Sequence, residues 1–91
     1  EKSAIASKQL LISLQIDGEP VVRSNCIWAL GRMFDNLEES FRAQIVEALF
    51  NVLLNDVEPS VRDEARIVVE QFGISSVLSR LQQLSDEGAL V

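Results

Sequence analysis

The sequence contains no histidine and only one cysteine, Cys26. Histidine is the commonest general base, so its absence excludes histidine-based triads and dyads within this chain. A single cysteine excludes an internal disulfide framework and fits a reducing compartment. With no histidine beside it, few ways of building a zinc site remain. We therefore expect a protein that is not an enzyme and has no metal or cofactor.

Long apolar runs, glycine and proline are also scarce. No apolar stretch approaches the roughly 20 residues that span a bilayer, so no membrane contact is expected. The chain has 91 residues, of which 47% are hydrophobic, 4 are glycine and 2 are proline. This composition is that of one small domain with a core. No signal-peptide pattern is present, and we expect an intracellular protein, cytoplasmic or nuclear. The only methionine is Met33 and a helical pattern begins at the first residues, so we expect a segment excised from a longer chain.

Acidic residues outnumber basic ones by 14 to 8, which gives a net charge of −6. This balance argues against direct binding of nucleic acid through its phosphates. The excess lies in the second half, since residues 46–91 carry eight acids and three bases. If charge selects a partner, this half favours a basic one. The alternative is that the acids only keep a helical surface soluble.

Apolar residues at helical spacing predict an all-α fold with five helices. Their expected ranges are about 4–16, 20–34, 37–55, 59–72 and 75–84. Pro20 and Pro59 fall in a first helical turn, where the missing N–H costs nothing. Asn36 and Glu39 have the spacing of a capping box, and Gly73 suits a C-terminal stop.

The chain matches itself when it is shifted by 39 residues. The segment Asp17-Gly18-Glu19-Pro20-Val21-Val22-Arg23 then aligns with Asp56-Val57-Glu58-Pro59-Ser60-Val61-Arg62. Apolar positions before and after these turns align as well. A period of this length is typical of helical solenoids, in which each helix pair buries its apolar faces against its neighbours.

The repeated Asp-x-x-Pro-x-Val-Arg turn, after a Leu-rich helix and before Ala and Leu at helical spacing, resembles the HEAT repeat over residues 4–34 and 40–73. The resemblance implies a right-handed α-solenoid with repeats at 1–36 and 37–73, and a partial third repeat or C-terminal cap at 74–91. Armadillo repeats are a near neighbour, and Gly88-Ala89-Leu90-Val91 resembles an armadillo helix start. The two-helix unit and the Asp/Arg pair favour HEAT.

The resemblance also assigns a structural role to the charged residues of the two turns. In HEAT proteins such residues form a ladder between repeats, which here would consist of Asp17, Arg23, Asp56 and Arg62. Cys26 occupies a small buried position without a neighbouring base, so we expect it to be unreactive. Neighbouring acids on one helix point about 100° apart and lack a calcium-type loop, so no cation site is predicted.

The second helix of each pair has a face that the core pattern does not use, and in HEAT-like solenoids this helix lines the concave docking side. The predicted partner-binding residues are Asn25, Trp28, Arg32, Asp63, Glu64, Ile67, Glu70 and Gln71. Trp28 and Arg32 are of the residue types that dominate binding hot spots. The alternative for Trp28 is packing between repeats.

These observations predict a non-catalytic scaffold that presents an acidic concave face to a protein or peptide, basic or helical and amphipathic. Two alternatives stay open: a chromophore-handling module similar to the HEAT subunits of bilin lyases, and a structural spacer without a ligand. Ile5, Ile12 and Ile16 lie where a preceding repeat would sit. We therefore also expect self-association through that face.

Overall fold

The computed structural model describes residues 2–90, with side chains from residue 4 onward. It contains the helices α1 (Lys2–Ile16), α2 (Pro20–Met33), α3 (Glu39–Asn55), α4 (Pro59–Gln71) and α5 (Ser75–Asp86), and a short 3₁₀ helix, η1 (Phe34–Asn36). No strand occurs between residues 2 and 90. The prediction of an all-α fold with five α-helices is confirmed.

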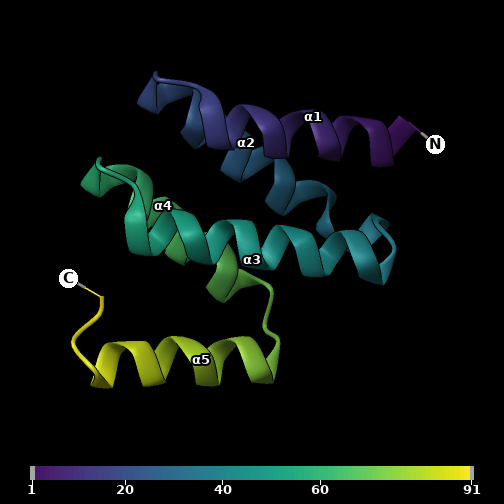
Figure 1. Cartoon of the computed structure of the whole chain (residues 1–91). Coiled ribbons are helices and arrows are strands. Elements are labelled where there is room, and N and C mark those ends of the chain that lie inside the picture. Colours follow the sequence, from purple (N-terminus) through teal and green to yellow (C-terminus); the bar gives the residue numbers. More distant parts are fainter. Residues whose placement is uncertain (1, 91) are drawn as a thin grey trace.

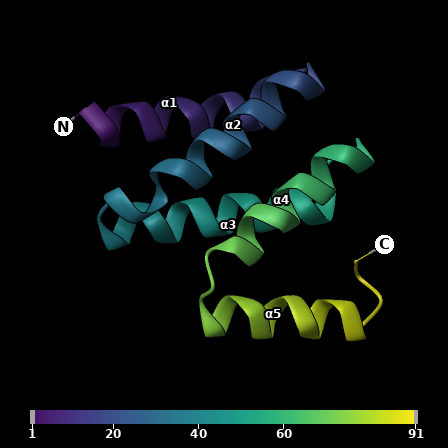
Figure 2. The ribbon, with the colours of Figure 1, turned by 180° about the vertical axis from the view of Figure 1, so that it is seen from behind.

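The helices form two layers (Figure 1). Helices α1, α3 and α5 lie one below the other in the front layer, while α2 and α4 lie behind them and face the viewer in Figure 2. Helix α1 packs against α2, α3 against α4, and α2 against α4, whereas α1 and α3 touch less extensively. The core fills the space between the layers, and its least exposed large side chains are Phe50, Ile27, Leu30, Ile45, Leu49, Val61, Val68 and Val69.

The two prolines begin equivalent helices, as predicted. Each occupies the first turn, and the residue before it, Glu19 or Glu58, has an extended backbone. The backbone N–H of Glu19 donates to Asp17 Oδ1 at 2.9 Å, and that of Glu58 donates to Asp56 Oδ1 at 3.0 Å. The 39-residue repeat therefore extends to the hydrogen bonds of both turns.

The predicted capping box at Asn36 is wrong. Asn36 ends η1, and α3 begins at Glu39 after Glu38, whose side chain makes no capping hydrogen bond. The connection is fixed by apolar burial instead, because Phe34 and Leu37 are both buried and the Leu37 N–H donates to the Phe34 carbonyl.

Three other helix ends differ slightly from their predicted positions. Helix α2 ends at Met33 and α4 at Gln71, each one residue early, while α5 continues two residues further, to Asp86. Gly73 follows α4 with φ +66°, a left-handed conformation that favours glycine and stops the helix as predicted. None of the described helices has the length and apolar character needed to cross a bilayer.

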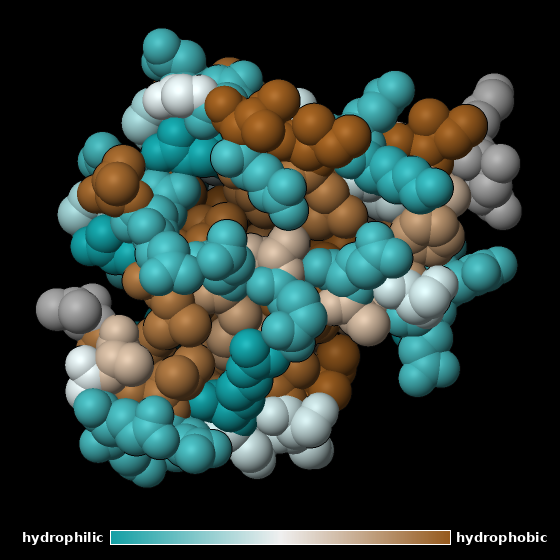
Figure 3. Space-filling model, viewed as in Figure 1, coloured by the Kyte–Doolittle hydropathy of each residue, from teal (hydrophilic) through white to brown (hydrophobic). Residues whose placement is uncertain are grey.

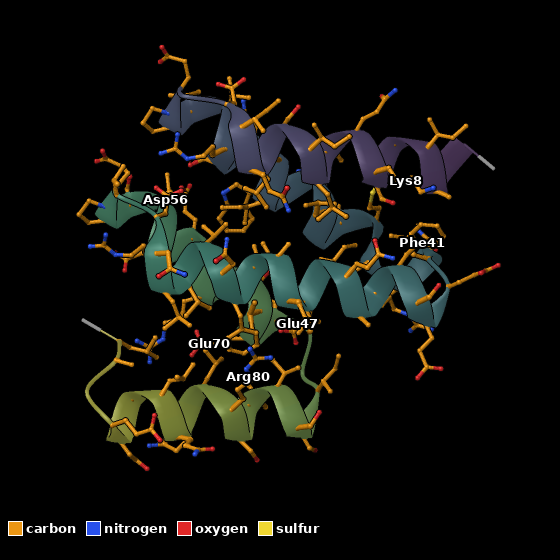
Figure 4. The ribbon with its side chains drawn as sticks, viewed as in Figure 1. Lys8, Phe41, Glu47, Asp56, Glu70 and Arg80 are labelled. Atoms are coloured by element: carbon orange, nitrogen blue, oxygen red, sulfur yellow. The ribbon has the colours of Figure 1, made fainter. Side chains whose placement is uncertain are left out.

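Helix α5 packs against α4, and the side chain of Arg80 connects it to α3. Arg80 donates two hydrogen bonds to the Glu47 carboxylate, at 2.6 and 3.2 Å, and its guanidinium carbon lies 3.9 Å from the centroid of the Phe50 ring. Figure 4 shows Arg80 and Glu47 facing each other across the space between the two helices. Val77 and Leu81 are the buried residues of α5. Its exposed side chains are polar except for that of Leu78, which is 41% exposed.

Candidate functional site

The turn residues form one ion pair that joins the two helix pairs. Arg23, at the start of α2, donates from Nε to Asp56 Oδ2 at 2.8 Å and from Nη2 to Asp56 Oδ1 at 3.0 Å. Its third nitrogen, Nη1, donates to the carbonyl of Asp17 at 2.9 Å. The two side chains retain only 10% and 8% of their exposure. A two-pronged contact of this kind fixes both orientation and register.

The pKa values of the pair change in the directions that strengthen it. Burial alone would raise the pKa of the Asp56 carboxyl. Hydrogen bonds from Arg23 and from the Glu58 N–H, with the charges of Arg23 and Arg62, outweigh burial and lower that pKa below its ordinary value. The hydrogen bond to Asp56 in turn raises the pKa of the Arg23 guanidinium. Both groups are therefore charged at neutral pH.

The other two predicted ladder residues repeat only half of this arrangement. Arg62 Nη1 donates to the Asp56 carbonyl at 2.6 Å, as Arg23 does to the Asp17 carbonyl. Within residues 4–90, Arg62 forms no ion pair with a carboxylate, and the Asp17 carboxylate forms none with an arginine. The ladder therefore has one complete rung, Arg23–Asp56, between the helix pairs.

The eight predicted partner-binding residues all lie on α2 or α4, the two helices of the rear layer (Figure 2). Six of them are exposed to solvent: Asn25, Arg32, Asp63, Ile67, Glu70 and Gln71. Ile67 keeps 42% of its exposure, which is high for a large apolar side chain. Trp28 and Glu64 are only partly exposed, and Trp28 packs against the core.

Glu64 of α4 forms hydrogen bonds to α2, a role that the sequence analysis did not predict. Its Oε1 accepts a hydrogen bond from Trp28 Nε1 at 3.0 Å, and its Oε2 accepts one from the Ser24 hydroxyl. The signal in the sequence was weak, because Ser24, Trp28 and Glu64 are unrelated by the 39-residue repeat. With both oxygens engaged inside the protein, Glu64 contributes less to an acidic docking surface than its charge suggests.

The exposed charges beside Ile67 are therefore fewer than predicted. Arg66 Nε lies 3.8 Å from Glu70 Oε2, and both side chains are about half exposed. Such a surface pair partly neutralises Glu70. Among residues 4–90, Asp63 is then the exposed acid of this face of α4 that forms no ion pair, and Arg32 is the exposed base of α2.

A concave feature lies in the front layer, between α1 and α3. It is a groove of about 960 Å³. Its apolar floor includes Leu11, Leu14, Ala48 and Val52, and its polar rim includes Gln15, Gln44, Asn51 and Asn55. Figure 3 shows brown side chains between these two helices, framed by teal ones. Loose packing of α1 on α3 leaves this space, and the sequence did not indicate it.

Neither the single cysteine nor the acidic residues of the described part of the chain form a reactive or metal-binding group. Cys26 is a buried free cysteine, and burial raises the pKa of its thiol, which opposes formation of the reactive thiolate. Between residues 2 and 90, no group of three or more acids, cysteines or histidines is placed to hold a metal ion.

Comparisons with protein-family models, with curated proteins and with solved structures found no match. The assignment of a function therefore depends on the geometry of this chain alone.

Proposed function

We propose that this chain is a non-catalytic, intracellular protein-binding scaffold, a HEAT-like α-solenoid segment that binds a basic amphipathic helix on the face formed by α2 and α4. The solenoid assignment is supported by the repetition between the helix pairs. Both second helices begin at a proline, both preceding turns carry the same side-chain-to-backbone hydrogen bond, and Arg23 joins one pair to the next.

The observation that carries the binding proposal is Ile67, which is exposed on α4 one helical turn after Glu64, the residue that fixes the indole of Trp28. Fixing Trp28 in one orientation before binding reduces the side-chain entropy that a partner must remove. The exposed part of the indole and Ile67 would form the apolar centre, and the polar residues around them would form the rim. A partner helix would cover this centre with its own apolar stripe.

Charge favours a basic partner. The preference is weaker at the face formed by α2 and α4 than the net charge of residues 46–91 suggests. Residues 46–91 carry eight acids and three bases, and Asp63 on α4 is exposed and forms no ion pair with the side chains that the structure describes. Electrostatic attraction of this size acts mainly on the association rate and weakens as salt screens it. Apolar contact with Ile67 would supply most of the affinity.

The experiment uses Trp28 as its probe, because it is the only tryptophan and the chain has no tyrosine. A lysine-rich amphipathic helical peptide is titrated into the protein, and a peptide with the same apolar stripe but glutamate in place of lysine serves as a control. We expect the lysine peptide alone to shift the Trp28 emission, with a Kd that rises with salt.

Variants locate the binding face. Ile67→Asn should weaken binding about tenfold, since it removes the apolar centre. The matched control is Leu78→Asn on α5, where an equally exposed apolar side chain (41% against 42%) is replaced away from the site. Equal effects of the two variants, or equal binding of the two peptides, would assign the function elsewhere.

A further inference from the structure

A pocket of about 450 Å³ lies on the side of α3 that faces α5, away from the α1–α3 groove. The start of α5 lies below α3 in the view of Figure 1, and both helices contribute to the lining. The apolar part of the lining includes Phe34, Val46 and Ile74. A volume of this size is in the range of small-molecule sites.

Arg42 of α3 lines this pocket and has no partner within the protein. Its side chain is only partly exposed, and its Nε is buried without a hydrogen bond. Within residues 4–90 it forms no ion pair. Arg23 and Arg80, in contrast, each donate two hydrogen bonds to one carboxylate. Buried polar atoms of proteins almost always have a partner, so a partly covered guanidinium without one points to an anionic ligand.

The outer end of the Arg42 guanidinium is open to such a ligand. Nε is the one nitrogen of this group that is buried without a partner, so Nη1 and Nη2 remain accessible. These two nitrogens form a planar fork that matches the two oxygens of a carboxylate. Because the positive charge is shared by all three nitrogens, a carboxylate at the outer end neutralises the buried part as well.

The acids of the pocket limit the charge that the ligand can carry. Glu47 lines it but accepts two hydrogen bonds from Arg80, which offsets its charge. Glu39, three residues before Arg42, also lines it, is exposed and forms no ion pair within residues 4–90. A doubly charged phosphate would be repelled by Glu39 more strongly than a carboxylate with a single charge.

The rest of the lining favours an apolar body for the ligand. Beside Arg42 and the two glutamates, the pocket offers one polar side chain, the hydroxyl of Ser76. A peptide backbone would bring N–H and C=O groups that need hydrogen-bond partners, and their burial without partners is costly. An aliphatic chain needs none and can lie against Phe34, Val46 and Ile74.

We propose that this pocket binds a small monocarboxylate with an aliphatic chain. The carboxylate binds Nη1 and Nη2 of Arg42 and can accept a further hydrogen bond from Ser76, while the chain covers the apolar wall. The proposal is independent of partner binding at α2 and α4, because none of the eight residues proposed for that face lines the pocket.

Titration of octanoate into the isotope-labelled 91-residue chain tests the proposal, with the Nε–H signal of Arg42 followed by NMR. We expect the signal to shift with a Kd of roughly 0.1–1 mM, in the range of small ligands with one charged contact. Octanamide has the same chain but no charge, and it should bind about tenfold more weakly.

Variants separate the two parts of the site. Arg42→Gln should weaken octanoate binding about tenfold, followed through the backbone N–H signal of Val77, with unchanged helical circular dichroism because no partner is lost. Its matched control is Arg32→Gln on α2, which should bind as the parent does. Ile74→Asn should weaken binding about threefold, whereas Leu78→Asn, of similar exposure (41% against 36%) but outside the lining, should not.

Several results would overturn the proposal. These are a parent chain that does not bind octanoate, equal binding of octanamide, and unchanged binding by Arg42→Gln. Glu39→Gln should tighten octanoate binding about twofold, because it removes a like charge from the pocket. A Glu39→Gln variant that instead unfolds more easily and binds no octanoate would assign Arg42 to an ion pair with Glu39. Tighter binding of a leucine-ended peptide, lost in Arg42→Gln, would assign the pocket to a protein C-terminus instead.

Discussion

Removing the carboxylate of Asp56 tests whether the single complete rung holds the two helix pairs together. Asp56→Ala deletes the acceptor of two hydrogen bonds from Arg23, at 2.8 and 3.0 Å, and of one from the Glu58 N–H at 3.0 Å. Arg23 keeps its bond to the Asp17 carbonyl but loses its counter-ion. The variant therefore leaves a largely covered positive charge without a partner.

The burial of the ion pair sets the expected magnitude of the loss. Exposed ion pairs contribute about 0–1 kcal/mol, whereas breaking a fully buried pair costs about 3–5 kcal/mol. The Asp56 side chain is 8% exposed but lies in a surface turn, where water and neighbouring groups reach the site more easily than in a core. We expect Asp56→Ala to lower the free energy of unfolding by about 2–3 kcal/mol.

The matched control is Asp17→Ala. Asp17 accepts the equivalent turn hydrogen bond, from Glu19 N–H at 2.9 Å, but forms no ion pair with an arginine among the described residues. Loss of that bond alone should cost about 0.5–1.5 kcal/mol. Urea denaturation followed by circular dichroism measures both variants, and a slope near 1 kcal/mol/M predicts a midpoint about 2–3 M lower for Asp56→Ala. Equal midpoints for the two variants would refute the rung.

Three further outcomes are expected. Gly31→Ala should destabilise the fold by about 1–2 kcal/mol in urea, because the new Cβ would lie 2.8 Å from Val68 Cγ1, whereas Gly18→Ala, with nothing within 4 Å, should change stability by only a few tenths. Stability should fall as pH drops below about 4, since the lowered pKa of Asp56 supports the fold only while that carboxyl is ionised in the folded state; an acid titration of the helical signal checks this, with Asp56→Ala less sensitive. Cys26 should react with a thiol reagent at the rate of unfolding, and fast reaction in the native protein would contradict its burial.

Most of the helical architecture follows from short-range patterns in the sequence. The prolines and the 39-residue repeat place two helix starts correctly, because a proline at such a start and the preceding aspartate act locally. The start of α3 was misplaced because a long-range effect decides it. Burial of Phe34 and Leu37 holds the connection, and Phe34 stacks on Phe72 from the end of α4 with ring centroids 3.8 Å apart.

The candidate site was predicted less completely than the helices. Helical spacing correctly separated exposed Asn25 and Ile67 from the core, since exposure follows from the face of a helix. It could not show that Glu64 turns towards α2, because that depends on the distance between two helices 36 residues apart in sequence. Nor could it show the groove between α1 and α3, which results from how closely two helices pack.

Contacts that join α2 to α4, or to the turn that precedes α4, are distributed along the whole length of α2. At the start of α2, Arg23 binds Asp56; in the middle, Trp28 donates to Glu64. At the end, Gly31 allows Val68 to approach closely, and Phe34 stacks on Phe72 just beyond.

Each of these contacts differs in chemistry, so a change of pH or salt that weakens the ion pair leaves the apolar and aromatic contacts in place. The two helices are therefore expected to move as one body, and a partner bound across them would meet a preformed surface. Affinity at such a surface depends on the match to Ile67 and Trp28 rather than on closure of one helix over another. The face formed by α2 and α4 differs in this respect from the α1–α3 groove, because α1 and α3 pack against each other less extensively.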